Sequence, residues 1–572
     1  MPTPTLEHLL DRLDELKRPT GARGGAELIR TLRRVARRRF RDADSLIRFH
    51  EILLFMRAYP QGVAALRETE RLLRSFGGRV ALLSASGAET WQLEAAEVSG
   101  IAGTGLYAVF GYDIVRWLAG AHPRRVQVAW DDAEDHAHLT ALLPRFLPLF
   151  EEDAYVDAHV PFREWLRAAR RGGESELGWI VRQFDSLPLS ERERAVLFDP
   201  LKLWVRWELG DTPATRTHMR RSVREIFYHR RPLLGRRDVD LARELDAAPM
   251  PVEKLTRAAA ERVLAQGRDT MAVRFRELHG FTHGEARTVV RADAGRGLEI
   301  FLWGVPAARR LPLLAYHAGV FFKNGLPAGY HEGLSLFGRT EIGLNLFYTF
   351  RDGESAWTYA RLMRLYRQLL GTDTFSVEPY QLGGSGNSEG VASGAFWFYR
   401  KLGFRPVRPD IKRLVETEER KIETRAGYRT PPRTLRRLAA GHVIYEARDA
   451  PAPGEWDHFH VRRIGLAVAR RAARDFGGDA QKIRAASLAA VTRALGIRRE
   501  KFNDEEQRAL SNLALPLALL PDLARWTPDE RRDLVRIVRA KAGPDETRYL
   551  RLLRRHARLR RAIIALGTNR GR

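Results

Sequence analysis

The chain has 572 residues, too many for one hydrophobic core, and we expect two to four domains. Cysteine is absent, which excludes disulfides, thiolate metal sites and a cysteine nucleophile. The formal net charge of +26 would attract polyanions such as nucleic acid, acidic membranes and phosphate-bearing cofactors. However, the arginines are spread along the chain and not clustered, which favours the alternative that the genome uses arginine where others use lysine.

The start of the chain and its apolar runs bear on location. Residues 1–8 contain no basic segment followed by an apolar one, as a secretory signal peptide would. Apolar runs such as residues 311–315 are far shorter than the ~20 residues that cross a bilayer. We therefore expect a cytoplasmic protein without a membrane span.

Residues 1–250 are predicted to be mostly helical. Leucines at positions 6, 9, 10, 13 and 16 repeat at helical spacing, and Thr5 can cap the helix that they form. Further helices are expected at residues 25–40, 44–58, 62–76, 163–171 and 191–197. We assign this stretch to a helical N-terminal region.

A dense group of acidic residues and histidines lies within that region. It consists of Asp131, Asp132, Glu134, Asp135, His136 and His138. Carboxylates and imidazoles at this density can hold a divalent metal. However, a helix would point His136 and His138 to different sides, and acidic residues before an apolar run also begin ordinary helices. We favour the structural interpretation and predict no metal site.

The pattern becomes strand-like after residue 287. Residues 288–291 and 298–304 read as two strands joined by a turn at 294–297. Asn324-Gly325 stands between two further strand-like runs, 319–323 and 326–337, and is a strong hairpin signal. A strand over 340–350, a helix over 356–370 and a short strand over 375–380 follow.

A glycine-rich turn over residues 383–390 then leads into a segment dense in aromatic residues. Arg400 and Lys401 precede Gly403, an arrangement typical of a helix C-terminus. We predict one helix over residues 391–402.

The end of this segment resembles the GNAT superfamily of acyl-CoA N-acyltransferases. The family pattern is Asn-x-x-Ala-x-x-x-Tyr-x-Lys-x-Gly-Phe, and the matching residues are Ala395, Tyr399, Lys401, Gly403 and Phe404. The order of strands and helices agrees with the family core over residues 319–406. The resemblance implies a GNAT-like mixed-sheet α/β domain at 251–447, between helical regions at 1–250 and 448–572.

The resemblance implies N-acyl transfer from an acyl-CoA, such as acetyl-CoA, to the amine of a small molecule or protein. Tyr399 occupies the position of the family's acid, which protonates the departing thiolate. Glu341 and Glu332, on the predicted central strands, are the candidate bases. Backbone groups of Leu346, Phe347 and Tyr348 would hold the pantetheine arm.

In the family, the coenzyme pyrophosphate binds at the loop that precedes the next helix. Here that loop contains Arg351, Gly353 and Ser355, and a helix N-terminus suits an anion. The loop also reads as an ordinary turn with Ser355 as a helix cap. Gly384 and Gly386 of the second glycine-rich turn are the alternative anion-binding residues.

A second hypothesis is non-enzymatic. In it, a catalytically degenerate GNAT-like scaffold uses a basic surface to recruit nucleic acid or another polyanion. The altered loop at 351–355, with Asp352 and Glu354, favours this hypothesis, as does Ala392 at the family's Asn position. Tyr399 and the Lys-x-Gly-Phe tail favour the enzyme.

Overall fold

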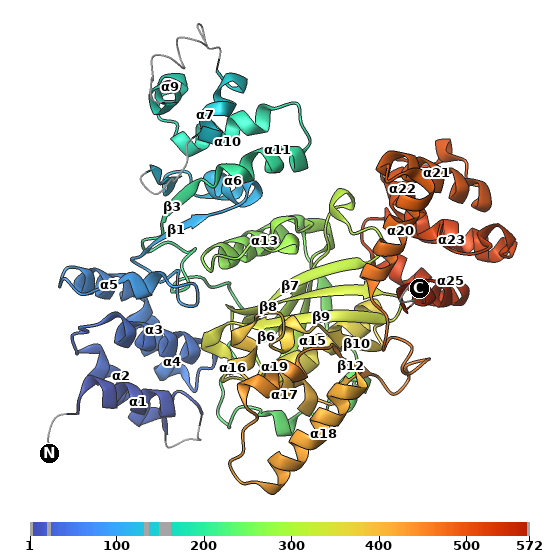
Figure 1. The fold of residues 1–572 in the computed structure, drawn as a ribbon. Coiled ribbons are helices and arrows are strands. Elements are labelled where there is room, and N and C mark those ends of the chain that lie inside the picture. The colour runs from blue at the N-terminus through green and yellow to red at the C-terminus, as the bar shows by residue number, and fades with distance from the viewer. Residues whose placement is uncertain (1–3, 20–23, 131–136, 148–161, 569–572) are drawn as a thin grey trace. The chain divides into compact units, whose positions relative to one another are not determined.

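A computed structural model describes residues 4–19, 24–130, 137–147 and 162–568 (Figure 1). The chain divides into two compact units. The first comprises the described residues of Met1–Pro232, Glu261–Thr282 and Lys323–Pro327, and the second those of Leu233–Ala260, His283–Phe322 and Ala328–Arg572. The sequence-based boundaries near residues 250 and 448 stay predictions.

The first unit begins with the predicted amphipathic helices. Thr5 caps α1 (Leu6–Leu16) because its hydroxyl accepts a hydrogen bond from the amide of His8, and four leucines of α1 are buried. The helices that follow are α2 (Gly24–Ala36), α3 (Ala43–Ala58), α4 (Val63–Arg74), α5 (Phe76–Ser84), α6 (Tyr112–Ala121), α7 (Ala137–Leu142), α9 (Phe162–Ala169), α10 (Glu176–Ser186) and α11 (Glu191–Phe198). Two more follow later in the chain, α13 (Arg257–Ala272), whose first residues belong to the second unit, and α14 (His279–Thr282).

The first unit also contains a small sheet that the sequence did not reveal. Its three strands, β1 (Gly105–Val109), β2 (Val126–Val128) and β3 (Trp204–Glu208), pair antiparallel in the order β1-β3-β2. Leu106, Val205 and Trp207 are buried in the core of this unit. The central strand comes from residues far along the chain, so local patterning gives no hint of the pairing.

The group of acidic residues and histidines at 131–138, for which a structural role was favoured, falls mainly outside the described residues, which omit 131–136. His138 lies in α7. Across the ranges that the structure describes, no group of three or more His, Cys, Asp or Glu side chains could hold a metal ion.

The second unit is built on a nine-stranded mixed sheet with the strand order β4-β5-β6-β7-β8-β9-β10-β12-β11. Its strands are β4 (Val252–Lys254), β5 (Val290–Gly295), β6 (Leu298–Leu302), β7 (Ala315–Lys323), β8 (Leu326–Leu336), β9 (Arg339–Leu346), β10 (Thr374–Val377), β11 (Arg405–Pro406) and β12 (Val443–Glu446). β10 runs parallel to β9, whereas β8 pairs antiparallel with β9 and β12 pairs antiparallel with β10. A mixed α/β architecture was expected here, and it is confirmed.

The turns between the early strands follow the sequence. Asn324 and Gly325, between β7 and β8, both adopt a positive φ, 47° and 84° respectively. A two-residue turn of this kind matches the twist of the flanking strands, and asparagine and glycine tolerate it best. The predicted hairpin is therefore confirmed.

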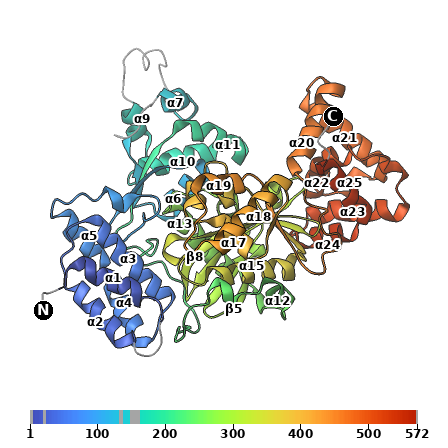
Figure 2. The ribbon, with the colours of Figure 1, turned by 60° about the horizontal axis from the view of Figure 1, so that its bottom comes forward.

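Helices of the second unit gather on one side of the sheet (Figures 1 and 2). They are α15 (Ser355–Leu370), α17 (Ala395–Lys401), α18 (Pro409–Thr424) and α19 (Pro432–Leu438), while the short α12 (Leu241–Asp246) also packs on α15. Buried Tyr359, Met363 and Tyr366 belong to the same core as sheet residues such as Phe375. As predicted, α15 ends at Gly371, which adopts a left-handed conformation.

The prediction of a single helix over residues 391–402 was wrong, because the structure has two helices there. α16 (Ser388–Ala392) is capped by Asn387, and α17 begins after Gly394. Gly394 has φ of 66°, which a continuous right-handed helix cannot contain. Because of this break, α17 is a separate helix from α16, and its residues Phe396 and Tyr399 are buried.

The C-terminal part of the second unit is helical, as expected. It contains α20 (Val461–Phe476), α21 (Ala480–Leu495), α22 (Asp504–Leu517), α23 (Pro528–Lys541), α24 (Thr547–Arg555) and α25 (Ala557–Thr568). The sequence of residues 545–566 predicts one helix, where the structure instead has α24 and α25. They are separated at His556, whose ring accepts a hydrogen bond from the Leu559 amide in place of a helical carbonyl.

Within the described ranges, none of the helices combines the length and apolar character that crossing a membrane would require.

Candidate functional site

The parallel strands β9 and β10 pair over a short distance and then part. Their register joins Arg339 to Thr374, Thr340 to Phe375 and Glu341 to Ser376. β10 ends at Val377, but β9 continues to Leu346 along its other neighbour, β8. In the described chain, residues 342–346 therefore have no strand partner on the β10 side.

A cavity of about 250 Å³ opens beside the part of β9 that extends past β10. We call it the Tyr399 cavity. It is lined by Leu344, Asn345, Leu346, Arg351, Ser355, Gln381, Asn387, Glu389, Gly390, Ser393, Ala395, Phe398 and Tyr399. The lining therefore combines the end of β9, the start of α15 and the two short helices α16 and α17.

Tyr399 enters this cavity from a rigid aromatic cluster. Its ring lies 5.4 Å from that of Tyr359, 5.2 Å from Phe398 and 5.7 Å from Phe404, measured between centroids. The residue is 4% exposed, and burial raises the pKa of the Tyr399 hydroxyl above its usual range. The hydroxyl therefore holds its proton at neutral pH, and it can donate that proton only to a base whose own pKa is raised by the same burial, such as an anion formed within the cavity.

Arg351 spans one side of the cavity. Its Nε donates a hydrogen bond of 3.2 Å to the Leu346 carbonyl, and its guanidinium forms an ion pair with Glu389 on α16. Among the backbone groups predicted to hold a pantetheine arm, Leu346 lines the cavity. The amide of Phe347 instead donates to Ala328 of β8, and Tyr348 is 61% exposed outside the lining.

The loop before α15 carries the predicted anion-binding residues. Ser355 lines the cavity, and its hydroxyl donates to the Arg351 carbonyl at 2.7 Å. The amide of Gly353 donates to the Phe350 carbonyl. Glu354 is buried and accepts a hydrogen bond of 2.9 Å from Arg296 Nε, so a guanidinium balances this carboxylate.

The second glycine-rich turn contributes Asn387, Glu389 and Gly390 to the lining of the Tyr399 cavity, but not the two glycines predicted to bind an anion. The Gly384 amide donates to the Pro379 carbonyl at 2.8 Å, and a Cβ there would come within 2.6 Å of the Ala439 carbonyl. This glycine is needed for close backbone packing. Gly386 adopts a positive φ of 84° in open space. Neither residue is in the lining.

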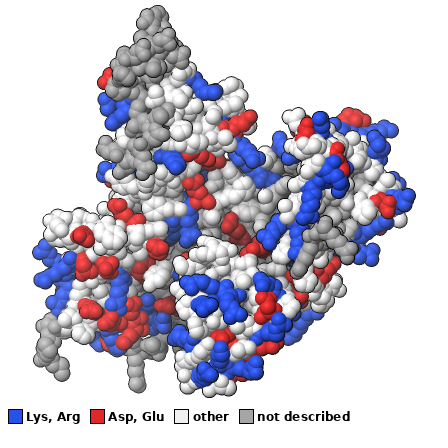
Figure 3. All heavy atoms as spheres, viewed as in Figure 1, with Lys and Arg blue, Asp and Glu red and all other residues white. Residues whose placement is uncertain are grey.

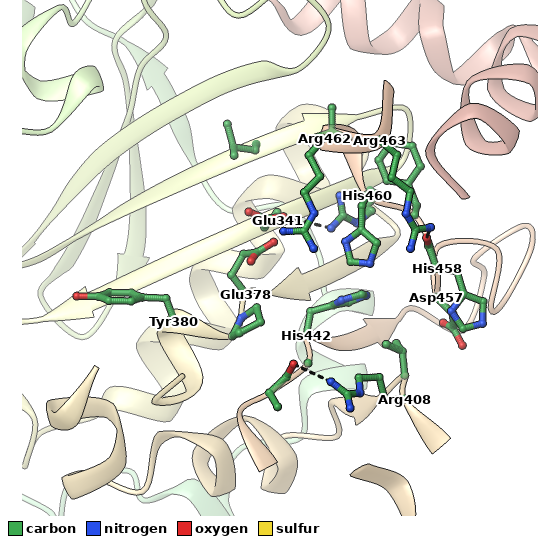
Figure 4. A pocket seen from close by; sticks show the side chains of 18 of the residues that line it. Glu341, Glu378, Tyr380, Arg408, His442, Asp457, His458, His460, Arg462 and Arg463 are labelled. Atoms are coloured by element: carbon green, nitrogen blue, oxygen red, sulfur yellow. Dashed lines mark hydrogen bonds and ion pairs between the residues drawn. The ribbon is translucent and has the colours of Figure 1, made fainter. Parts of the chain in front are cut away.

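A second cavity, of about 730 Å³, lies around the paired part of β9 and β10. We call it the Glu341 cavity (Figure 4). Residues from several elements line it: the start of β9, the residues that follow β10, the start of α18, the segment before β12 and the start of α20. Its charged or titratable groups are Arg339, Glu341, Glu378, Tyr380, Arg408, Asp410, His442, Asp457, His458, His460, Arg462 and Arg463.

Glu341 and Glu378 form a pair of carboxyl groups at the wall of this cavity. Burial raises the pKa of Glu341 to about 7; the nearby Arg339 opposes the rise, and the hydrogen-bonded Glu378 adds to it. The Arg339 guanidinium lies 3.2 Å from the Glu341 carboxylate. A carboxyl group with a pKa near neutrality can accept and release protons at physiological pH.

Sequence reasoning missed Glu378. Ser376 lies opposite Glu341 in the parallel register, and Glu378 is the first residue after the end of β10. The signal was an acidic residue on β9 and another directly after β10, and it can be recognised only once the pairing of β9 with β10 is known.

The other candidate base, Glu332, lies elsewhere. It sits on β8 and accepts a hydrogen bond from the hydroxyl of Tyr316. It belongs to the lining of neither the Glu341 cavity nor the Tyr399 cavity.

The two cavities share strand β9 and the turn that follows β10. On β9, Glu341 lines the Glu341 cavity and residues 344–346 line the Tyr399 cavity. In the turn after β10, Tyr380 lines the Glu341 cavity and Gln381 lines the Tyr399 cavity. Gly343 lies at the boundary, where a Cβ would be 3.5 Å from the side-chain nitrogen of Gln381. Glu341 on β9 and Tyr399 on α17 therefore line cavities on either side of this boundary.

Known protein-family models, curated proteins and solved structures provide no match to this chain. The class of protein that the fold defines is a mixed α/β protein with a nine-stranded sheet, two of whose strands part beside a cavity.

Proposed function

We propose that the second unit is an N-acyltransferase that transfers an acyl group from an acyl-CoA to an amine. The observation that carries the proposal is the parting of β9 from β10, with Tyr399 beside the parted end and Glu341 beside the paired end. The tail motif that contains Tyr399 supports the same conclusion independently of the geometry.

The proposed reaction needs no covalent intermediate on the protein. Glu341, ionised above pH 7, accepts a proton from the amine, directly or through water. The amine nitrogen attacks the thioester carbonyl carbon, the carbon–sulfur bond breaks, and the thiolate takes up the Tyr399 hydroxyl proton. The products are an amide and free coenzyme A, and solvent returns the proton that Glu341 holds to Tyr399.

The residues present fit a thioester on a slender arm. A cavity of about 250 Å³ has room for the linear pantetheine but not for the whole coenzyme, whose nucleotide would lie at the mouth. Arg351 and the start of α15 would hold the pyrophosphate there, since a guanidinium and a helix N-terminus both attract anions. Glu389 would then release Arg351 to the phosphates.

Titration calorimetry with acetyl-CoA tests this proposal. We expect micromolar association, weakened about tenfold or more by Arg351→Glu because the substitution places a second carboxylate beside Glu389. Arg367→Glu is the matched control, since Arg367 lies in the last turn of α15 and pairs with Asp449 instead. Absence of heat with any acyl-CoA would remove the proposal.

The scaffold hypothesis remains the alternative. On the face seen in Figure 3, Lys and Arg side chains are interspersed with Asp and Glu, so the net charge is spread over the surface there. If a polyanion is nevertheless the partner, binding of a single-stranded oligonucleotide should weaken steeply with salt. Binding that is absent or insensitive to salt would count against this alternative.

A further inference from the structure

The Glu341 cavity is far larger than an acid–base pair requires. Its volume of about 730 Å³ is that of a binding pocket for a whole small molecule. Glu341 and Glu378 stand at the wall formed by β9 and the end of β10, and Arg462 and His460 reach into the same space from the start of α20 (Figure 4). The strand wall carries the two carboxyl groups, with Arg339 beside Glu341, and we call the wall formed by the start of α20 and the segment before β12 the basic end of the cavity.

The basic end is formed by the start of a long helix. α20 has 16 residues, carries no acidic residue in its first turn and receives no side-chain cap from His460. The backbone amides of Val461 and Arg462, which line the cavity, donate to no other described residue. A helix N-terminus of this kind carries partial positive charge that an anion can balance.

A buried imidazole points to a ligand at the same place. His442 is 7% exposed, and its Nε2 has no hydrogen-bond partner among the residues that the structure describes. Its ring lies against that of His460, 5.3 Å between centroids, and it faces the cavity (Figure 4). A buried polar atom without a partner is costly, so a ligand group that pairs with Nε2 would be favoured.

The arginines of the basic end differ in the partners that their guanidinium groups already have. Arg408 is paired with Asp410, and the Arg463 guanidinium donates to the carbonyls of His458 and Thr568. The guanidinium of Arg462 lines the cavity and makes no ion pair with a described carboxylate. Arg462 is therefore the cation best placed to receive a ligand's negative charge.

We propose that the Glu341 cavity binds an amine that also carries an anionic group, a carboxylate or a phosphate. Its ammonium lies at Glu341 and Glu378, and its anionic group lies at Arg462, His442 and the start of α20. An amino acid and a phosphorylated amino alcohol both have this chemistry. The inference rests on the proposed function, because it names the class of amine that would accept the acyl group.

The test compares amines that differ in the anionic group alone. The 20 common L-amino acids are compared with their α-amides, and O-phosphoethanolamine with ethanolamine, so that the two sources of negative charge are separated. Release of the coenzyme A thiol from acetyl-CoA measures transfer. Calorimetry of each amine without acetyl-CoA measures binding.

Three variants accompany the wild type. Arg462→Ala removes the charge, Arg462→Lys keeps it, and Arg470→Ala removes a charge from the same helix outside the cavity lining. We expect an acid-bearing amine to exceed its neutral counterpart by about tenfold or more in kcat/KM. Arg462→Ala should abolish that preference, Arg462→Lys should keep part of it, and Arg470→Ala should leave it unchanged.

The outcomes separate this inference from the proposed function. If an acid-bearing amine gives a heat of binding that is abolished by Arg462→Ala, and no amine is acylated, the binding site is supported and the acyltransferase proposal is refuted. Transfer to neutral amines at the same rate, unaffected by Arg462→Ala, overturns the inference and leaves the acyltransferase. If no amine of the set binds and none is acylated, the inference is overturned.

Discussion

Replacing Glu341 by glutamine should change how the stability of the second unit depends on pH. Raising a carboxyl pKa from 4.5 to about 7 means that ionising Glu341 in the folded protein costs about 3 kcal/mol more than in the unfolded chain. Below pH 4.5 both states hold the proton and nothing is lost. As pH rises from 4.5 to about 7, only the unfolded chain releases this proton, so the wild type loses up to about 3 kcal/mol of stability, and the loss stays constant above that range.

Glutamine keeps the shape of the side chain but cannot ionise, so the variant escapes this loss. The free energy of unfolding of Glu341→Gln, relative to wild type, should therefore rise between pH 5 and pH 8. The gain has an upper limit of about 3 kcal/mol, because the variant also leaves Arg339 without its carboxylate partner.

Urea unfolding followed by tryptophan fluorescence at pH 5, 6, 7 and 8 measures this difference. Glu253→Gln is the control, since Glu253 on the edge strand β4 is 48% exposed and also pairs with an arginine. If the difference between Glu341→Gln and wild type is the same at pH 5 and pH 8, Glu341 does not carry the raised pKa and the argument for it as a base is refuted.

Three further predictions concern catalysis and backbone geometry. The rate of acyl transfer, followed as thiol release, should rise with pH through about 7, and Glu341→Gln should lower it by about 100-fold or more and flatten the profile; a variant with the wild-type profile would exclude Glu341 as the base. Tyr399→Phe should lower kcat by about 10-fold to 100-fold with little effect on acetyl-CoA affinity, and an unchanged kcat would exclude Tyr399 as the acid. Gly394→Ala should destabilise the protein by about 1 kcal/mol because Gly394 has a φ of 66°, seen as a lower midpoint of thermal unfolding, and an equal or higher midpoint would contradict the left-handed turn.

Much of the sheet was predictable because short-range chemistry determines it. Asn324-Gly325 fixes the β7–β8 hairpin, and Gly371 ends α15 where the apolar pattern stops. The tail motif led to Tyr399, which lies in the lining of a cavity. In each of these cases the relevant residues are close neighbours in the chain.

The remaining features depend on contacts between distant segments. β3 joins β1 across nearly a hundred residues, and no local pattern predicts that pairing. Glu378, His442 and Arg462 line the same cavity as Glu341, yet they follow different strands and helices. Gly394 also looked like an ordinary helix position, because sequence patterning does not distinguish a tolerated glycine from one that needs a positive φ.

The central claim is that the parted strands β9 and β10 hold an acyl-CoA. A crystal structure with a non-hydrolysable thioether analogue of acetyl-CoA tests it most directly. The account predicts that the pantetheine arm lies along residues 344–346 with its sulfur beside the Tyr399 hydroxyl. An analogue bound elsewhere, or absent from crystals grown with it at millimolar concentration, would contradict the account.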